Sequence, residues 1–161
     1  MAGSTSMPIP SLLATGLLPV GRHDATMVEV QAAFGSLNTT RMELYRKLEE
    51  FVELSKTFGV FRRVYIDGSF VTDKPTPGDI DSVLEMNTAD LLKFSAHPNR
   101  LALLDGFAVK AKYGVHLFMQ RETQLDSAGD MTLYFQQIKA ADAIHRKVDP
   151  STRRGILVVS L

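Results

Sequence analysis

The stretch VYIDGSFVTDKPTPGDIDSVLEM, residues 64–86, carries most of the information about the fold. β-Branched and apolar residues on both sides of its centre predict two strands, over residues 60–67 and 79–86. The intervening GSFVTDKPTPG is rich in glycine, proline, threonine and aspartate, which predicts a connector built of turns. On a strand, Asp79 and Asp81 point to the same face, about 7 Å apart along the backbone. We therefore expect two strands in hairpin-like succession with a pair of carboxylates on one face.

Residues on either side of this stretch predict helices and further strands. In TTRMELYRKLEEFVELSKTF, residues 39–58, apolar side chains recur at helical spacing, Thr40 and Glu43 form a capping-box pattern, and Gly59 ends the helix. Shorter helices are expected at about residues 26–35, 88–96, 99–110 and 130–145. Two more strands are expected, YGVHLFMQ and ILVVS, at residues 113–120 and 156–160. This order predicts an α/β (α+β) fold in which helices pack on one sheet.

Length and composition bound the domain organisation and the partners. The chain has 161 residues, the size of one domain, no Cys, and 18 basic against 18 acidic residues. Residues 1–25, with Pro8, Pro10 and Pro19, are expected to form an extended arm on a single domain of residues 26–161. The lack of Cys excludes disulfides, thiolate zinc sites and a Cys nucleophile, and it fits a cytoplasmic protein. Zero net charge makes long nucleic acid an unexpected partner, and the proline-interrupted N-terminus predicts neither a signal peptide nor a membrane span.

The connector and the strand after it contain the residues that predict chemistry. Asp79 and Asp81 offer oxygen ligands to one cation, which suits Mg²⁺ or Mn²⁺ completed by substrate phosphates. Gly68 leaves room for a phosphate beside the backbone, the Ser69 hydroxyl can donate to it, and Lys74 can neutralise its charge. The alternative is structural: the two aspartates could be turn and strand-edge residues, with Asp79 capping the turn.

This arrangement resembles a known signature. A Gly-Ser pair, nine residues and then Asp-hydrophobic-Asp is similar to the motif of the nucleotidyltransferase superfamily, which includes polymerase-β-like enzymes and minimal nucleotidyltransferases. The chain looks still more like a family of small bacterial proteins with a nucleotidyltransferase-like fold, on residues 16–35, the helix around Arg41, and residues 65–81 and 153–161. The resemblance implies a palm-like mixed sheet flanked by helices that binds a nucleoside triphosphate through Mg²⁺. It also implies that Gly68 and Ser69 hold the β- and γ-phosphates and that Asp79 and Asp81 bind the metal.

One position departs from that signature. Active members carry a third carboxylate on a later strand, but here the matching position between Val115 and Leu117 is His116. An imidazole with an ordinary pKa of about 6.5 can act as a general base. The resemblance thus suggests a metal-dependent nucleotidyltransferase with a hydroxyl acceptor on a protein, RNA or small molecule, in a toxin–antitoxin or phage-defence setting. The alternative is a degenerate nucleotide-binding or regulatory module, and a third possibility is an interaction protein.

Basic residues elsewhere admit two interpretations. Arg146 and Lys147, with Arg153 and Arg154, are expected to form a solvated loop, with contact to substrate phosphates as the alternative. Arg41, in the first turn of the long helix, is expected to pair with a nearby carboxylate.

Overall fold

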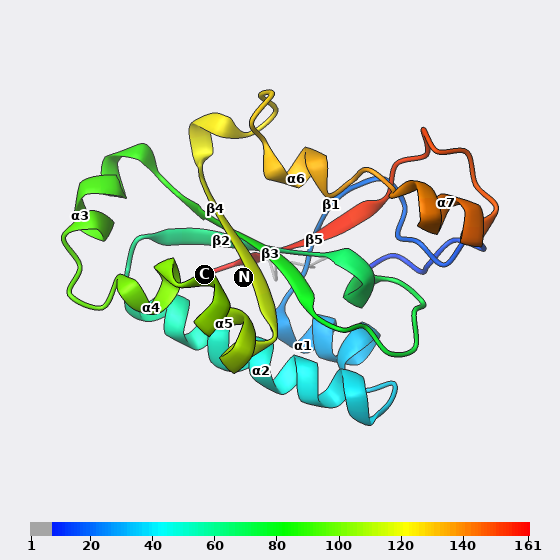
Figure 1. Cartoon of the computed structure of the whole chain (residues 1–161), viewed down its shortest axis with the longest axis horizontal. Coiled ribbons are helices and arrows are strands. Elements are labelled where there is room, and N and C mark those ends of the chain that lie inside the picture. Colours follow the sequence, from blue (N-terminus) through cyan, green and yellow to red (C-terminus); the bar gives the residue numbers. More distant parts are fainter. Residues whose placement is uncertain (1–7) are drawn as a thin grey trace, which may run out of the picture.

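A computed structural model describes residues 8–161 and contains one five-stranded mixed sheet (Figure 1). The strands lie in the order β1-β5-β2-β3-β4. Strand β2 runs antiparallel to both β3 and β5, whereas β4 is parallel to β3 and β1 is parallel to β5. Their bounds are Gly21–Asp24 (β1), Phe61–Asp67 (β2), Ile80–Met86 (β3), Val115–Arg121 (β4) and Gly155–Ser160 (β5). The expected mixed sheet with flanking helices is confirmed.

One long helix and several short ones surround the sheet. The long one is α2, Thr39–Thr57, and the others are α1 (Met27–Val30), α3 (Leu91–Ser95), α4 (Leu101–Leu104), α5 (Gly106–Tyr113), α6 (Met131–Tyr134) and α7 (Ala140–Arg146). Figure 1 shows α2 and α5 along one side of the sheet and α6 on the other. Within residues 8–161, no helix combines the length and apolar character needed to cross a bilayer.

The two faces of the sheet are packed differently. On the α2 side, alternate strand residues such as Val64, Ile66 and Leu84 join Leu48 and Phe51 of α2 in the main apolar core. The opposite face has a smaller apolar cluster, formed by Tyr65, Val83, Ile156 and Val158 with partly buried neighbours. Side chains alternate between the two faces along a strand. The polar residues Asp67, Asp81 and His116 therefore lie on the face of this smaller cluster, away from α2.

The N-terminal part differs from the expected arm. Leu17 and Leu18 are buried, and residues 21–24 form the edge strand β1. This strand pairs in parallel with β5, on the side of β5 that does not face β2. The arm expectation is therefore wrong for residues 21–24, since pairing with a strand remote in sequence is invisible to local composition. The first seven residues of the expected arm lie outside the described residues.

Several helix boundaries also differ. Asn38, not Thr40, caps α2, because its side chain accepts from the Arg41 backbone N–H. The helix expected at residues 88–96 begins with a 3-10 turn. The helix expected at residues 99–110 is divided into α4 and α5 at Asp105. The single helix expected over 130–145 is two, α6 and α7. Between them, Gln137 forms a bridge with Arg153, and this tertiary pairing overrides the helical pattern.

Candidate active site

Strand register brings two of the predicted site residues together. Asp81 of β3 and His116 of β4 are direct partners in the parallel pairing. The Nδ1 atom of His116 lies 3.2 Å from Oδ1 of Asp81. The His116 side chain is about half exposed (51%) and that of Asp81 is 22% exposed. The contact with Asp81 orients the imidazole and leaves its Nε2 atom available to a ligand.

Asp79 lies elsewhere than the alternation pattern predicts. The strand begins at Ile80, so Asp79 precedes it and is not held to the face of Asp81. Its Oδ2 atom makes an ion pair of 2.9 Å with Nζ of Lys110, which belongs to α5. The two carboxylates still interact: burial raises the pKa of Asp81 above its ordinary value, and the charge of Asp79 raises it further.

A tight turn sets the chain next to Asp81. Gly68 follows β2 directly and has a φ of +79°, a left-handed conformation that favours glycine. A Cβ atom at this position would lie 2.2 Å from Oδ2 of Asp81. Ser69 is partly exposed, and its carbonyl accepts from Thr72. The structure thus brings Gly68 and the Asp81 carboxylate into direct proximity, with Ser69 next along the chain.

The buried guanidinium of Arg41 holds the connector that follows this turn. Arg41 is 1% exposed, and it donates to four carbonyl groups, those of Phe34, Phe70, Thr72 and Lys74. The expected pairing of Arg41 with a carboxylate is therefore wrong, because carbonyl groups of the connector take up its donors instead. Lys74 itself is exposed, and within residues 8–161 its ammonium has no polar partner. The structure does not join it to Asp79 or Asp81.

Asp67, a residue that the sequence motif does not indicate, is adjacent to this arrangement. It is the last residue of β2 and the direct cross-strand partner of Asp81. It is 0% exposed, and within the described chain neither carboxylate oxygen has a hydrogen-bond partner. Burial raises the pKa of Asp67 well above its ordinary value; nearby Arg154 opposes this, while the charges of Asp81 and Asp130 add to it. The one available signal was an aspartate directly before the Gly-Ser pair.

Two arginines expected in a solvated loop have little exposed side chain: Arg154 is buried and Arg146 is partly buried. Arg154 is 7% exposed, donates to the Gly68 carbonyl and has an Nε atom with no partner among the described residues. Arg146 donates to the Thr15 carbonyl and pairs with Asp73 and Asp142. The solvated-loop interpretation is wrong for both, because Arg146 ends helix α7 and binds the connector at Asp73, and Arg154 binds the Gly-Ser turn at Gly68.

The donor set fits a hard divalent cation held in part by substrate. Among residues 8–161, no three Asp, Glu or His side chains gather as one ligand group. Mg²⁺ commonly uses only one or two carboxylates and completes its shell with phosphates and water. The partly exposed Asp81 beside the unpartnered, buried oxygens of Asp67 supplies such a pair.

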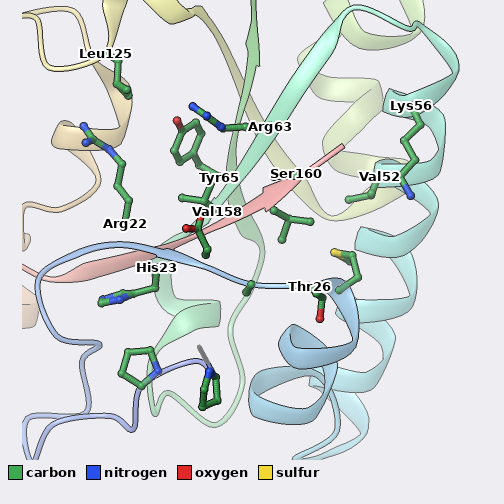
Figure 2. Close-up of a pocket in the computed structure, with 16 residues that line it drawn as sticks. Arg22, His23, Thr26, Val52, Lys56, Arg63, Tyr65, Leu125, Val158 and Ser160 are labelled. Atoms are coloured by element: carbon green, nitrogen blue, oxygen red, sulfur yellow. The ribbon is translucent and has the colours of Figure 1, made fainter. Parts of the chain in front are cut away.

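A groove of about 1230 Å³ lies at another part of the sheet. Figure 2 shows Arg63 and Tyr65 of β2, Val158 and Ser160 of β5, and Lys56 of α2 around it. None of the predicted site residues lines this groove. We therefore locate the candidate site by its chemistry, at the carboxylates, rather than by the size of a hollow.

Comparison with known proteins gives one match. A family model described as a family of unknown function (DUF6932) matches residues 10–160. No curated protein and no solved structure matches the chain significantly.

Proposed function

The chain belongs to this family of unknown function, and we propose that it is a metal-dependent nucleotidyltransferase. It would move a nucleoside monophosphate from a nucleoside triphosphate to a hydroxyl acceptor. The observation that carries the proposal is the strand register. It sets the Asp81 carboxylate against the Gly68 turn on one side and against His116 on the other. For this reaction a carboxylate can bind the metal, an open backbone turn can approach the phosphates, and an imidazole can act as the general base.

Binding of the triphosphate would use the turn and the surrounding cations. Gly68 and Ser69 present a partly exposed backbone and a hydroxyl to the phosphates. Asp81 and, once released from Lys110, Asp79 would hold Mg²⁺ or Mn²⁺, which neutralises phosphate charge. Lys110 would then contribute its ammonium to the phosphates. Lys139 is a further cation whose charge acts on Asp81, and Lys74 lies exposed on the connector.

His116 would supply the general base. The acceptor oxygen forms a bond to the α-phosphorus, while the bond from that phosphorus to the bridging oxygen breaks and pyrophosphate leaves. The acceptor proton passes to Nε2 of His116, because Nδ1 is engaged by Asp81. A positioned base of this kind contributes about 10²–10⁴-fold to the rate.

The test is incubation with each labelled nucleoside triphosphate, Mg²⁺ or Mn²⁺, and candidate protein, RNA and small-molecule acceptors. We expect Asp81→Asn to lower transfer at least 100-fold and His116→Gln about 100-fold. Asp126→Asn, at an exposed aspartate outside the site, is the matched control and should transfer normally. Transfer that survives Asp81→Asn would contradict this assignment of the site.

A second function is favoured by one specific observation. His116 stands where a further carboxylate is expected, and Lys110 already neutralises Asp79. Both features suit a module that binds nucleotide without transferring it. Such a module would gain about 2.7 kcal/mol of stability at a hundredfold excess of nucleotide over Kd and show no transfer. Both proposals assume a cytoplasmic setting, where nucleoside triphosphates are available.

A further inference from the structure

We propose that Asp67 is a metal-binding carboxylate of this site and binds, together with Asp81, the divalent cation that accompanies the triphosphate. This inference rests on the proposed function, because it adds a ligand to the same site. Strands β2 and β4 flank β3. Asp67 of β2 would supply the additional carboxylate that β4 lacks.

Register sets the separation of the two carboxylates. Asp67 of β2 and Asp81 of β3 are direct antiparallel partners, so their side chains share a face. Cβ atoms of such partners lie about 4.5–5.5 Å apart. An octahedral cation with Mg–O bonds of about 2.1 Å holds neighbouring ligand oxygens about 3 Å apart and opposite ones about 4 Å apart, separations that two facing carboxylates can span. Two facing carboxylates repel each other without such a bridge, and one cation removes the repulsion.

The absence of a structural partner for Asp67 points to a ligand. Polar atoms buried in proteins are nearly always hydrogen-bonded, yet in the described chain both oxygens of this fully buried carboxylate lack a partner. Arg154, whose positive charge acts on Asp67, gives its hydrogen bond to the Gly68 carbonyl instead. Arg154 therefore lowers the local charge without satisfying the carboxylate oxygens.

The path to Asp67 runs past Asp81. The Asp81 side chain is 22% exposed and lies between the buried Asp67 and the exposed imidazole of His116 in the strand order. A cation that enters with the phosphates at Gly68 meets Asp81 first and Asp67 behind it. Two other buried carboxylates are already bound, that of Glu85 by Tyr65 and Arg63 and that of Asp130 by Thr132, Gln120 and Arg22. Both oxygens of Asp67 and the Oδ2 atom of Asp81, which His116 does not contact, are thus available to a cation.

The test is Mn²⁺ binding, followed by electron paramagnetic resonance, with and without a non-hydrolysable nucleoside triphosphate. We expect Asp67→Asn and Asp81→Asn each to weaken Mn²⁺ binding at least tenfold. Asp24→Asn, at an exposed aspartate on strand β1 of the same sheet, should bind as the unaltered protein does. Thermal melting without metal shows that each variant is folded.

The outcomes separate the two proposals. Mn²⁺ binding by Asp67→Asn within twofold of the unaltered protein overturns the inference and leaves the proposed function standing; a buried water between Asp67 and Arg154 then accounts for the unpartnered atoms. Failure of the unaltered protein to bind Mn²⁺ with any triphosphate overturns both. If Asp67→Asn does not fold, crystals of the unaltered protein soaked with Mn²⁺ decide the matter. An anomalous peak between Asp67 and Asp81 supports the inference, and a peak on Asp81 alone rejects it.

Discussion

Two buried aspartates, one at the end of strand β2 and one at the start of helix α6, have opposite surroundings. Asp130, the cap of α6, is 3% exposed and is fully partnered. Its carboxylate accepts from the Asp126 backbone, from the backbone and hydroxyl of Thr132, and from Gln120, and it pairs with Arg22 at 2.8 Å. Asp67 is 0% exposed and has no such partner within the described chain.

The difference separates a carboxylate that stabilises the fold from one that is available to a ligand. Burying a carboxylate costs free energy that hydrogen bonds and an opposite charge must offset. At Asp130, hydrogen bonds and the Arg22 ion pair offset this cost. At Asp67, no hydrogen bond of the described chain offsets it. The same change, Asp to Asn, at both positions therefore tests the comparison directly.

The largest expected effect is at Asp130. Asp130→Asn turns an amide group toward donors that now bind a carboxylate, so we expect a loss of about 3 kcal/mol in the free energy of unfolding. Asp126→Asn is the matched control, because Asp126 pairs with the same Arg22 but its side chain is 69% exposed. That variant should unfold in urea as the unaltered protein does. Equal stability of the two variants would contradict the structural role of Asp130.

The contrast between Asp130 and Asp67 also shows which features of the fold and site can be predicted from the sequence. Alternation and turn composition are local properties, so residues 64–86 predict β2, β3 and the connector well. The same alternation, with the motif resemblance, selected Asp81 and His116, and parallel register brings them together. Asp79 shows the limit: it precedes its strand by one residue, and Lys110 from another element takes its carboxylate.

The environment of a residue is harder to predict from its neighbours in sequence. Three of the four carbonyl partners of Arg41 belong to a connector that follows it much later in the chain. Asp67 is buried on the face where Arg154, near the C-terminal end, donates to the next residue, Gly68. A sequence pattern identifies an aspartate before Gly-Ser, but only the tertiary structure shows that its oxygens are buried and unpartnered.

The second largest effect is expected at Gly68, in the turn that follows Asp67 and contacts Asp81. Gly68→Ala combines a left-handed backbone with a collision against Asp81, so we expect a loss of about 2 kcal/mol and a displaced carboxylate. Gly59→Ala is the control: Gly59 has a φ of +64°, but the nearest atom to an added Cβ is Lys93 Nζ at 3.8 Å. It should lose about 1 kcal/mol, from backbone strain alone. Mn²⁺ binding should be lost only in Gly68→Ala; its retention there would show that Asp81 adjusts.

A smaller effect appears in acid. Burial opposes ionisation of Asp130, but hydrogen bonds from Asp126, Thr132 and Gln120 outweigh it and lower the pKa of Asp130 below its ordinary value. The unfolded chain then binds this proton at higher pH than the folded one, so stability rises with pH in this range. The contribution is present above the ordinary pKa of about 3.9 and is lost as the pH falls through the lowered value. Urea unfolding at several pH values should show a flatter acid limb for Asp130→Asn, and an unchanged slope would contradict this origin.

The smallest expected effect is at Asp67 and is the most informative. Without metal and nucleotide, Asp67→Asn removes no hydrogen bond of the described structure and gives Asp81 a neutral amide as its cross-strand partner. We expect the free energy of unfolding to stay within about 0.5 kcal/mol of the unaltered protein, or to rise. A carboxylate that stabilises the fold behaves as Asp130 does, so a loss of more than about 1 kcal/mol in urea would place Asp67 in the same class. Unchanged stability together with weakened Mn²⁺ binding is the result that distinguishes a ligand from a structural residue, because a structural role cannot produce both.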